Sequence, residues 1–564
     1  MKRLQRYQML RSNISDHELT TDYGLCGSQI NLSKFNGWVN RNHSLSLDLH
    51  SSMVDRMAAS VDAVSNAISD QQVIYGVTTC FGGMSNNQIE CHDAAALQAN
   101  LLSFLASGAG PELAACHTRG AMLLRANVLL QGKSGIRLEV IERLVDFLKA
   151  GAIPIVREYG SIGASGDLIP LGTIARAISG SCGKVNVNVN GEVCDAPTAL
   201  ERLDLKPIEL RAKEGLALVN GTSFSSAIAA NSTIAAKQSL AISFVVQSIL
   251  MRALQVDLDP FQAFVHQSKP HRGQVWSAKI IRDLLSDGLA QPSCPTEKVQ
   301  DRYSLRCFPQ YAGSIVEGIS RIQGVVETEM NSVSDNPLID PDSGKFYQSG
   351  NFLGQYLGIA MDDLRRFIGL LAKHLDVQIA SLVAPEFNHG LSPSLRGNDD
   401  RSFNMGLKGL QICGNSIMPM LTYLGNPIVE HFPTHAEQFN QNINGLSWGA
   451  ANMAWKSVGM FQHYLAVASI FAVQAIDLRA KSSLGHYDGS QLLGSINRQF
   501  YVNLCERLSV QPGPDRPLLF NDTDRWLEQD IEQLTQDIAG QGQMVQSVRP
   551  IIESFNQFCD ETPS

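Results

Sequence analysis

Apolar residues recur at helical spacing through most of this chain. Between residues 361 and 382 they follow one another at intervals of one, three or four, at Leu364, Phe367, Ile368, Leu371, Leu375, Ile379 and Leu382. Such a stripe predicts a long helix with one buried side, while Asp362, Arg365 and Lys373 point elsewhere. Similar patterns predict further helices at 51–69, 92–106, 224–256, 311–330 and 446–478.

The segment 224–256 is apolar nearly all the way round. A helix of this kind is buried among other helices, within one chain or across a subunit boundary. We therefore expect a large helical bundle and an oligomer. Near the end of the chain, the pattern predicts a last exposed helix that begins near Thr523, carries Trp526 and Leu534, and ends at Gly540.

One segment has the pattern of a β-strand instead. Val185, Val187 and Val189 alternate with asparagines, and Asn190-Gly191 is a favoured two-residue turn before a partner strand at 192–194. This predicts a small peripheral hairpin. The fold class is accordingly mainly all-α, a large bundle of long helices with small β-hairpins at its periphery.

Composition and charge exclude several classes of function. The chain has 564 residues, 44% of them hydrophobic and 18% charged, with a formal net charge of −9, which is typical of a globular protein and unfavourable for binding nucleic acid. No apolar run approaches the ~20 residues that span a membrane. Its 11 cysteines include no Cys-x-x-Cys pair, and its 13 histidines form no ligand cluster, so we expect no metal. The sequence has neither a P-loop nor a Gly-x-Gly-x-x-Gly motif after a strand, and no apolar stretch follows its basic start to make a secretory signal, so we expect no nucleotide and a cytoplasmic location.

The most informative residues are Ala164-Ser165-Gly166, within Gly-Ser-Ile-Gly-Ala-Ser-Gly-Asp at 160–167. In a chain that folds back here, the Gly166 nitrogen could attack the Ala164 carbonyl carbon, and loss of two waters would give a five-membered imidazolone. One water takes the Ser165 hydroxyl and leaves an exocyclic methylene, an electrophile that no ordinary side chain supplies. Glycine suits the attacking position because it tolerates strained dihedral angles. By itself, Ala-Ser-Gly is a common loop tripeptide.

The context gives the triplet its meaning, because the sequence from 160 onward resembles the signature of the aromatic amino acid ammonia-lyases. The resemblance extends over nearly the whole chain, in the family's order, through Tyr75-Gly-Val-Thr-Thr, Asn220-Gly-Thr-Ser, Gln300-Asp-Arg-Tyr-Ser-Leu-Arg306-Cys, Asn331-Ser-Val-Ser-Asp-Asn336-Pro and Glu437-Gln-Phe-Asn-Gln441. It implies a 4-methylideneimidazole-5-one group (MIO) formed from Ala164, Ser165 and Gly166. The closest resemblance is to bacterial phenylalanine ammonia-lyases, including those of cyanobacteria.

The resemblance also implies an architecture. We expect an MIO-bearing domain at 1–215, a central helical bundle at 216–480 and a helical C-terminal region at 481–564. The assembly would be a homotetramer in which each active site is shared between subunits. The substrate would be a small molecule, with no nucleic acid, membrane or metal as partner.

Catalytic roles follow from the matching positions. Tyr75, on a glycine-bounded loop, would be the base, and its phenol, with an ordinary pKa of ~10, would need a lowered pKa to act near neutrality. The amide of Asn220 would bind the imidazolone carbonyl. Gln300, Tyr303 and Arg306 are spaced by three, so a helical segment would place all three on one face. Arg306 would then pair with the substrate carboxylate, with Tyr303 near the amine.

The remaining predicted residues would bind substrate, and each is placed by the resemblance. Asn336 would help to hold the carboxylate. Glu437 and Gln441, four apart on a predicted helical face, would lie near the amine, with Lys408 pairing with Glu437. The apolar pocket for the ring would be formed by Phe104, Leu105, Leu168, Leu216 and Phe352.

The pair Phe104-Leu105 matches phenylalanine-preferring members, whereas tyrosine-preferring members carry histidine where Phe104 stands. Leu105 offers no partner to a substrate hydroxyl, and a buried unpaired hydroxyl costs ~1–3 kcal/mol. The predicted activity is therefore elimination of ammonia from L-phenylalanine to give trans-cinnamate. A phenylalanine 2,3-aminomutase, a tyrosine or histidine ammonia-lyase, and a silent helical scaffold are the alternatives. Cys80 and Ser349 replace usual glycines, and the 285–299 stretch is short.

Overall fold

The computed structural model describes residues 23–40, 44–180, 184–287, 299–431, 435–511 and 513–561. These residues form two compact units. The first contains the described residues of 1–227, 327–353 and 434–444, and the second those of 228–326, 354–433 and 445–564. The expected division placed borders near 215 and 480, whereas the first unit reaches 227 and also contains two later segments. Most of the short 285–299 stretch lies outside the described residues.

The first unit combines short helices with small sheets. Its helices are α2 (Leu32–Val39), α3 (Ser51–Ser69), α4 (Ala94–Phe104), α5 (Ala115–Leu129), α6 (Leu138–Ala150), α7 (Leu168–Ser179), α8 (Ala196–Arg202) and α9 (Glu214–Val219). Its strands are β1 (Tyr23–Leu25), β2 (Leu45–Leu47), β3 (Ala109–Glu112), β4 (Ala152–Pro154), β5 (Arg157–Tyr159), β6 (Asn186–Val189), β7 (Glu192–Asp195), β8 (Leu338–Ile339) and β9 (Phe346–Tyr347). Every sheet in this described part has two or three strands.

The predicted hairpin is confirmed. β6 and β7 pair antiparallel with Val187 opposite Cys194, and the turn residues Asn190 and Gly191 both have positive φ. This backbone suits the twist of a two-residue hairpin. The sequence pattern did not indicate β4, which pairs with β6 and makes the sheet three-stranded in the order β4-β6-β7.

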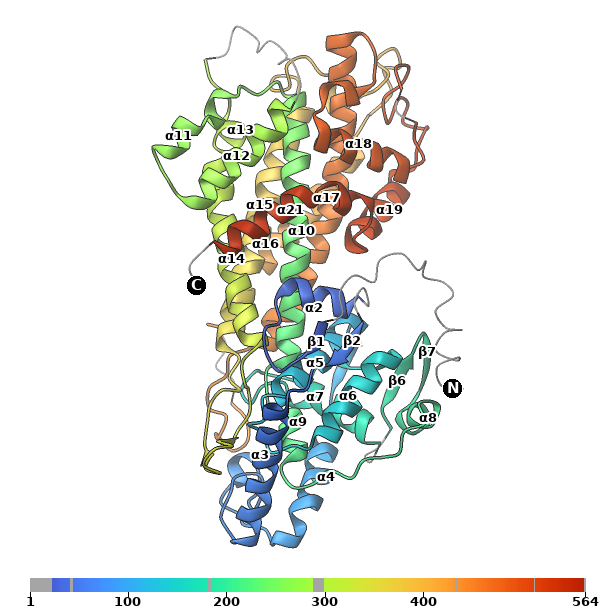
Figure 1. Cartoon of the computed structure of the whole chain (residues 1–564). Helices are drawn as coiled ribbons and strands as arrows, with labels where there is room; N and C mark the ends of the chain where they lie inside the picture. The colour runs from blue at the N-terminus through green and yellow to red at the C-terminus, as the bar shows by residue number, and fades with distance from the viewer. Residues whose placement is uncertain are drawn as a thin grey trace. The chain divides into compact units, whose positions relative to one another are not determined.

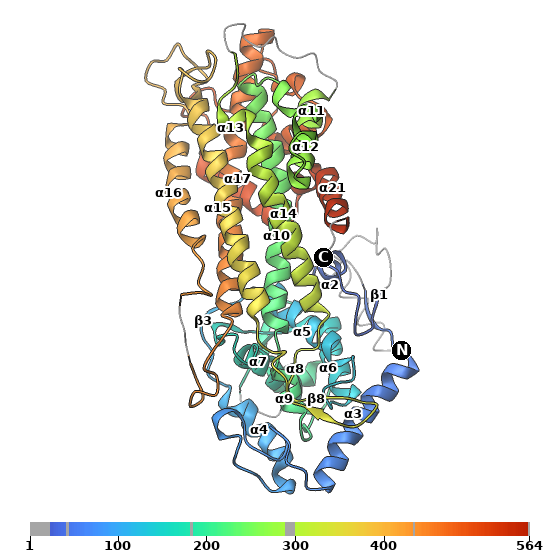
Figure 2. The same cartoon turned by 90° about the vertical axis from the view of Figure 1, so that its left-hand side faces the viewer.

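The second unit is a bundle of long helices. These are α15 (Gln355–Val383), α16 (Lys408–Leu424), α17 (Ser447–Leu484), most of α14 (Phe308–Met330), which ends in the first unit, and most of α10 (Ser223–Ala253), which begins in the first unit. They run side by side, and α15 packs against both α16 and α17 (Figure 1 and Figure 2). Shorter helices complete the unit, at α11 (Ala263–Gln267), α12 (Arg272–Ser286), α13 (Tyr303–Arg306), α18 (Ser495–Arg507), α19 (Leu527–Ala539), α20 (Gln543–Ser547) and α21 (Arg549–Asp560). The mainly helical fold class is confirmed.

The all-round apolar helix is buried as expected. Along α10, Phe224, Ile228, Phe244 and Ile249 have no exposed surface. Both α10 and α17 are long and apolar enough to cross a membrane by length and composition, which corrects the expectation that no segment comes close. In α10, 94% of the most apolar 18-residue stretch is buried inside the structure, as in a core helix.

One prediction near the C-terminus is wrong. The helix expected from Thr523 to Gly540 begins at Leu527, after an exposed Trp526, and it is not the last one. It is followed by α20 and α21. In α21, the buried Ile551, Phe555 and Phe558 lie on one face of the helix. The prediction took Gly540 as the end of the last helix, because glycine usually marks a helix end.

Candidate active site

The Ala-Ser-Gly triplet lies in a tight loop immediately before α7. The Ser161 hydroxyl accepts a hydrogen bond from the Gly163 N–H and donates one to the Gly166 carbonyl oxygen, each at 3.0 Å. Gly166 has a φ of +70° and lies against Gly221, so a Cβ at this position would overlap the Gly221 backbone. The triplet therefore needs glycine at its third position for both backbone conformation and space.

Asn220 follows the end of α9 and points its amide at the triplet. Its Nδ2 donates a hydrogen bond to the Ser165 carbonyl oxygen at 2.9 Å. The side chain is buried, and its Oδ1 has no hydrogen-bond partner among the described residues. The structure thus brings Asn220 and the triplet together.

A buried arginine fixes the backbone around Asn220. The Arg125 guanidinium donates to the carbonyl oxygens of Ala217 at 2.9 Å, Ser334 at 3.0 Å and Asn220 at 3.2 Å. Burial lowers the pKa of Arg125 to about 10, so the group keeps its charge at neutral pH. Sequence reading missed this residue, because its three acceptors lie about 90 and 200 positions away in the chain.

Asp167, directly after the triplet, was also missed. Its carboxylate is fully buried and accepts hydrogen bonds from the Ser225 N–H at 2.7 Å and the Ser225 hydroxyl at 2.6 Å. Burial raises the pKa of Asp167 to about 6, against these opposing hydrogen bonds. The signal in the sequence that could have identified Asp167 is a charged residue placed between the triplet and the apolar start of α7.

Tyr75 lies at the start of a hydrogen-bonded loop. Its phenolic oxygen accepts a hydrogen bond from the Gly82 N–H at 3.0 Å, and its ring meets the Phe81 ring edge to face at 6.4 Å. The Cys80 N–H donates to the Asn87 carbonyl oxygen at 2.9 Å. Hydrogen bonds from the backbone N–H groups on both sides of Phe81 thus hold the loop.

The expected lowering of the Tyr75 pKa is not what this chain produces. Burial raises the pKa of Tyr75, and the nearby Glu437 carboxylate raises it further, while the Gly82 N–H opposes both. Desolvation and a neighbouring negative charge each disfavour a phenolate, which explains the direction.

The segment 436–441 is a tight turn and not the helix that the spacing of Glu437 and Gln441 predicted. Glu437, Gln438 and Phe439 all have positive φ, and Ala436 pairs with Gln441 across the turn. The helical prediction is therefore wrong, because a spacing of four fits a closed turn equally well.

This turn nevertheless brings both predicted residues to the site. Gln441 Nε2 donates to the Ser165 hydroxyl at 3.0 Å. The Glu437 carboxylate lies against Gly82, where a Cβ would overlap it. Burial raises the pKa of Glu437, and hydrogen bonds with Asn440 and Gln441 oppose the shift. The turn thus touches both the triplet and the Tyr75 loop.

The predicted apolar pocket residues differ in exposure. Leu105 and Leu216 are buried, whereas Leu168 and Phe352 are half-buried and Phe104 is 55% exposed. Leu105 packs against Gly172 of α7, where a Cβ would lie 3.2 Å from that of Leu105. α4 therefore ends on an exposed side chain, Phe104, and the residue that follows the helix, Leu105, is packed inside the unit.

Asn336 is held by its neighbours in the first unit. Its Oδ1 accepts a hydrogen bond from the Ser349 N–H at 2.7 Å, and the Ser349 hydroxyl donates to the Asp335 carbonyl oxygen at 2.7 Å. The Asp335 carboxylate forms a fully buried ion pair with Lys213 at 2.8 Å. Ser349 thus helps to position Asn336, the predicted carboxylate-binding residue.

Four predicted residues belong to the second unit. α13 begins at Tyr303, so the exposed Gln300 precedes the helix and the prediction of a shared face is wrong for that residue. The Arg306 guanidinium lies over the Tyr303 ring at 4.6 Å, and its buried Nε has no hydrogen-bond partner in the described part of the chain. Lys408 is exposed at the start of α16, and Glu437 lies in the first unit, so their pairing stays a prediction.

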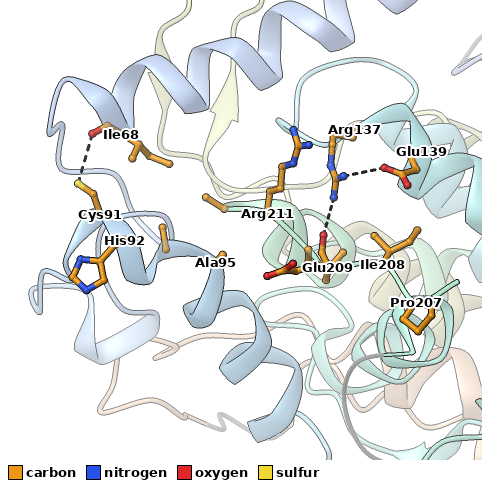
Figure 3. A pocket seen from close by; sticks show the side chains of 13 residues that line it. Ile68, Cys91, His92, Ala95, Arg137, Glu139, Pro207, Ile208, Glu209 and Arg211 are labelled. Carbon is orange, nitrogen blue, oxygen red and sulfur yellow. Dashed lines mark hydrogen bonds and ion pairs between the residues drawn. The ribbon is translucent and has the colours of Figure 1, made fainter. Parts of the chain in front are cut away.

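The first unit also contains a cavity of about 410 Å³, and no predicted site residue lines it. It lies between the starts of α4 and α6 and the segment 207–212 (Figure 3). Its Arg137 side chain is neutralised by ion pairs with Glu139 at 2.9 Å and Glu214 at 2.7 Å. Across the described ranges, no group of three histidine, cysteine, aspartate or glutamate side chains could hold a metal ion.

Comparison with known proteins places this site in context. A family model described as aromatic amino acid lyase matches residues 33–500. The chain is 50% identical to a phenylalanine ammonia-lyase of Nostoc punctiforme, over 88% of this chain and 89% of the relative. It is 39% identical to an aromatic ammonia-lyase of Loktanella atrilutea, over 89% and 93%. A solved Pantoea agglomerans phenylalanine aminomutase, 26% identical, matches 91% of this chain and 98% of its own with a TM-score of 0.81.

Proposed function

Because the chain belongs to the aromatic amino acid lyase family, whose members are carbon–nitrogen lyases, we propose that it eliminates ammonia from L-phenylalanine to give trans-cinnamate. The observation that carries the proposal is the contact set around Ser165, whose carbonyl and hydroxyl oxygens are bound by Asn220 and Gln441. The 50% identity to a phenylalanine ammonia-lyase supports phenylalanine as the substrate.

The reaction needs an electrophile, which we assign to an MIO group formed from Ala164, Ser165 and Gly166. Ser165 O, which Asn220 binds, is the oxygen that would become the imidazolone carbonyl, and the Ser165 hydroxyl is the oxygen that would leave as water. Gly166, with its positive φ and no room for a Cβ, fits the cyclising residue. When formed, the group supplies an exocyclic methylene that activates the substrate for loss of ammonia.

The chain's own side chains would do the remaining work. Tyr75 would take the β-proton of the substrate on its phenolic oxygen. Arg306 would form two parallel hydrogen bonds with the substrate carboxylate, which Asn336 would also help to hold. Tyr303 would lie near the amine. Arg306 Nε and Asn220 Oδ1, which have no hydrogen-bond partner among the described residues, leave hydrogen-bonding capacity for a ligand or a partner subunit.

We further propose a homotetramer with shared active sites. The outer surface of α16 exposes Ile412, Met420 and Tyr423, at 65%, 53% and 70% of their surface. Apolar exposure of this kind along one helix is typical of a subunit interface.

A pH profile should reveal the influence of Glu437 on Tyr75. Burial raises the pKa of Tyr75 and the Glu437 carboxylate raises it further, and a base must be ionised, so activity should rise with pH as the phenol loses its proton. Glu437→Gln removes that negative charge and should move the rise in kcat/KM to lower pH. A shift toward higher pH would contradict this reading, and Glu430→Gln, at an exposed glutamate, is the control.

Specificity should respond to the residue at 104. Phe104→His supplies a partner for a substrate phenol and should raise the kcat/KM ratio of tyrosine over phenylalanine by about 5- to 150-fold, since a satisfied buried hydroxyl is worth ~1–3 kcal/mol. Competition between the two substrates measures the ratio directly. An unchanged ratio would mean that this position does not meet the substrate ring.

Product analysis of the purified protein with L-phenylalanine tests the proposed function. Cinnamate as the main early product supports the lyase. The structural likeness to a phenylalanine aminomutase makes β-phenylalanine the specific alternative, and its predominance would move the chain to that activity. No product from phenylalanine, with turnover of tyrosine or histidine, would reassign the substrate.

A further inference from the structure

One polar side chain is buried on the apolar face of α4. Gln98 has no exposed surface and lies among the buried Ala94, Leu101 and Leu102 of the same helix. A buried amide must have hydrogen-bond partners, or it costs free energy. Its partners identify what it does.

Both ends of the Gln98 amide are bound by backbone. Nε2 donates to the Gly76 carbonyl oxygen at 3.1 Å, and Oε1 accepts from the Leu216 N–H at 2.9 Å. Leu216 lies in the first turn of α9, where main-chain N–H groups have no acceptor within their own helix. Gln98 therefore caps α9 with one atom and holds the Tyr75 loop with the other.

The surrounding glycines show how closely these segments meet. Gly76 has a φ of +66°, and a Cβ there would lie 2.6 Å from Leu216 Cδ2 and 2.8 Å from the Phe81 ring. A Cβ at Gly215 would lie 3.0 Å from the Gln98 side chain. α4, α9 and the Tyr75 loop thus come together around a single side chain.

We propose that Gln98 is a positioning residue that sets the place of the Tyr75 base relative to the apolar wall at Leu216. This inference rests on the proposed function, in which Tyr75 and Leu216 meet the substrate. Gln98 itself has no exposed surface with which to touch a ligand. Its hydrogen bonds fix the backbone at Gly76, next to Tyr75, and at the start of α9. They thereby set the distance between the Tyr75 base and Leu216 of the apolar pocket.

Two substitutions separate this role from simple packing. Gln98→Met keeps the volume and removes both hydrogen bonds, so we expect kcat to fall by about 10-fold or more, with a smaller change in KM. Gln98→Glu keeps the acceptor for Leu216 but, when ionised, repels the Gly76 carbonyl. Its activity relative to the unsubstituted protein should rise as the pH falls, because a protonated carboxyl again donates to Gly76.

Hydrogen exchange gives a readout that does not depend on turnover. In Gln98→Met, the amides of 75–83 and of Leu216 should exchange faster than in the unsubstituted protein. The matched control is Gln474→Met in the second unit, because Gln474 is equally buried and also binds backbone, donating to the Leu395 and Leu519 carbonyl oxygens at 2.9 Å. Exchange at 75–83 and kcat should be unchanged in this control.

The outcomes are distinguishable. Unchanged exchange at 75–83 together with unchanged kcat in Gln98→Met would overturn the positioning role, as would an equal fall of kcat in Gln474→Met. If the unsubstituted protein forms no cinnamate, the proposed function fails, and the exchange comparison still decides whether Gln98 holds the loop.

Discussion

Replacement of Ser165 by alanine is expected to lower the turnover of L-phenylalanine by at least about 1,000-fold, because the reaction then loses its electrophile. Alanine has no hydroxyl to lose as water, so no methylene can form. The contacts made by the main chain persist, including that of Asn220 with the carbonyl oxygen of residue 165. Cinnamate formation, followed by absorbance, measures the effect.

The fold should survive this change. Among the residues that the structure describes, only one side-chain hydrogen bond, from Gln441 Nε2, ends on the Ser165 hydroxyl. Circular dichroism and the denaturation midpoint should therefore match those of Ser381→Ala, a half-buried serine of α15 whose hydroxyl donates to the Val377 carbonyl oxygen of the same helix. A Ser165→Ala protein that retains more than about a tenth of the activity would rule out an electrophile from this triplet.

Tyr75→Phe is expected to lower kcat by about 100- to 10,000-fold, the usual contribution of a general acid–base group. The change removes the phenolic oxygen and keeps the ring against Phe81. KM should change much less, because the assigned carboxylate contacts belong to Arg306 and Asn336. Initial rates over a range of phenylalanine concentrations separate the two constants.

Tyr347→Phe on β9 is a suitable control, since this tyrosine is 54% exposed and has no assigned role. It should keep full activity. If Tyr75→Phe also kept its kcat, another group would have to remove the β-proton.

The elements predicted best from sequence are those set by local periodicity and turn chemistry. The helix expected at 51–69 spans those residues in α3, and Asn190-Gly191 closes its hairpin as expected. In both cases the signal lies within a few neighbouring residues, so tertiary contacts had little to override.

Features that depend on distant partners could not be predicted in this way. The spacing of Glu437 and Gln441 suggested a helix, but the segment closes as a turn against Gly82 and Gly83. The pKa of Tyr75 is raised by burial and by Glu437, which is more than 350 positions away in the chain. Gln98 finds its partners 22 and 118 positions away, so its own helix gives only the signal of one polar residue on an apolar face.

The mass of the peptide that contains residues 164–166 tests the central claim most directly. If Ala164, Ser165 and Gly166 form the electrophile, this peptide from the purified protein is lighter than its sequence mass by two water molecules, while other peptides have their full mass. The same peptide at its full sequence mass, from protein that actively converts L-phenylalanine, would contradict the account.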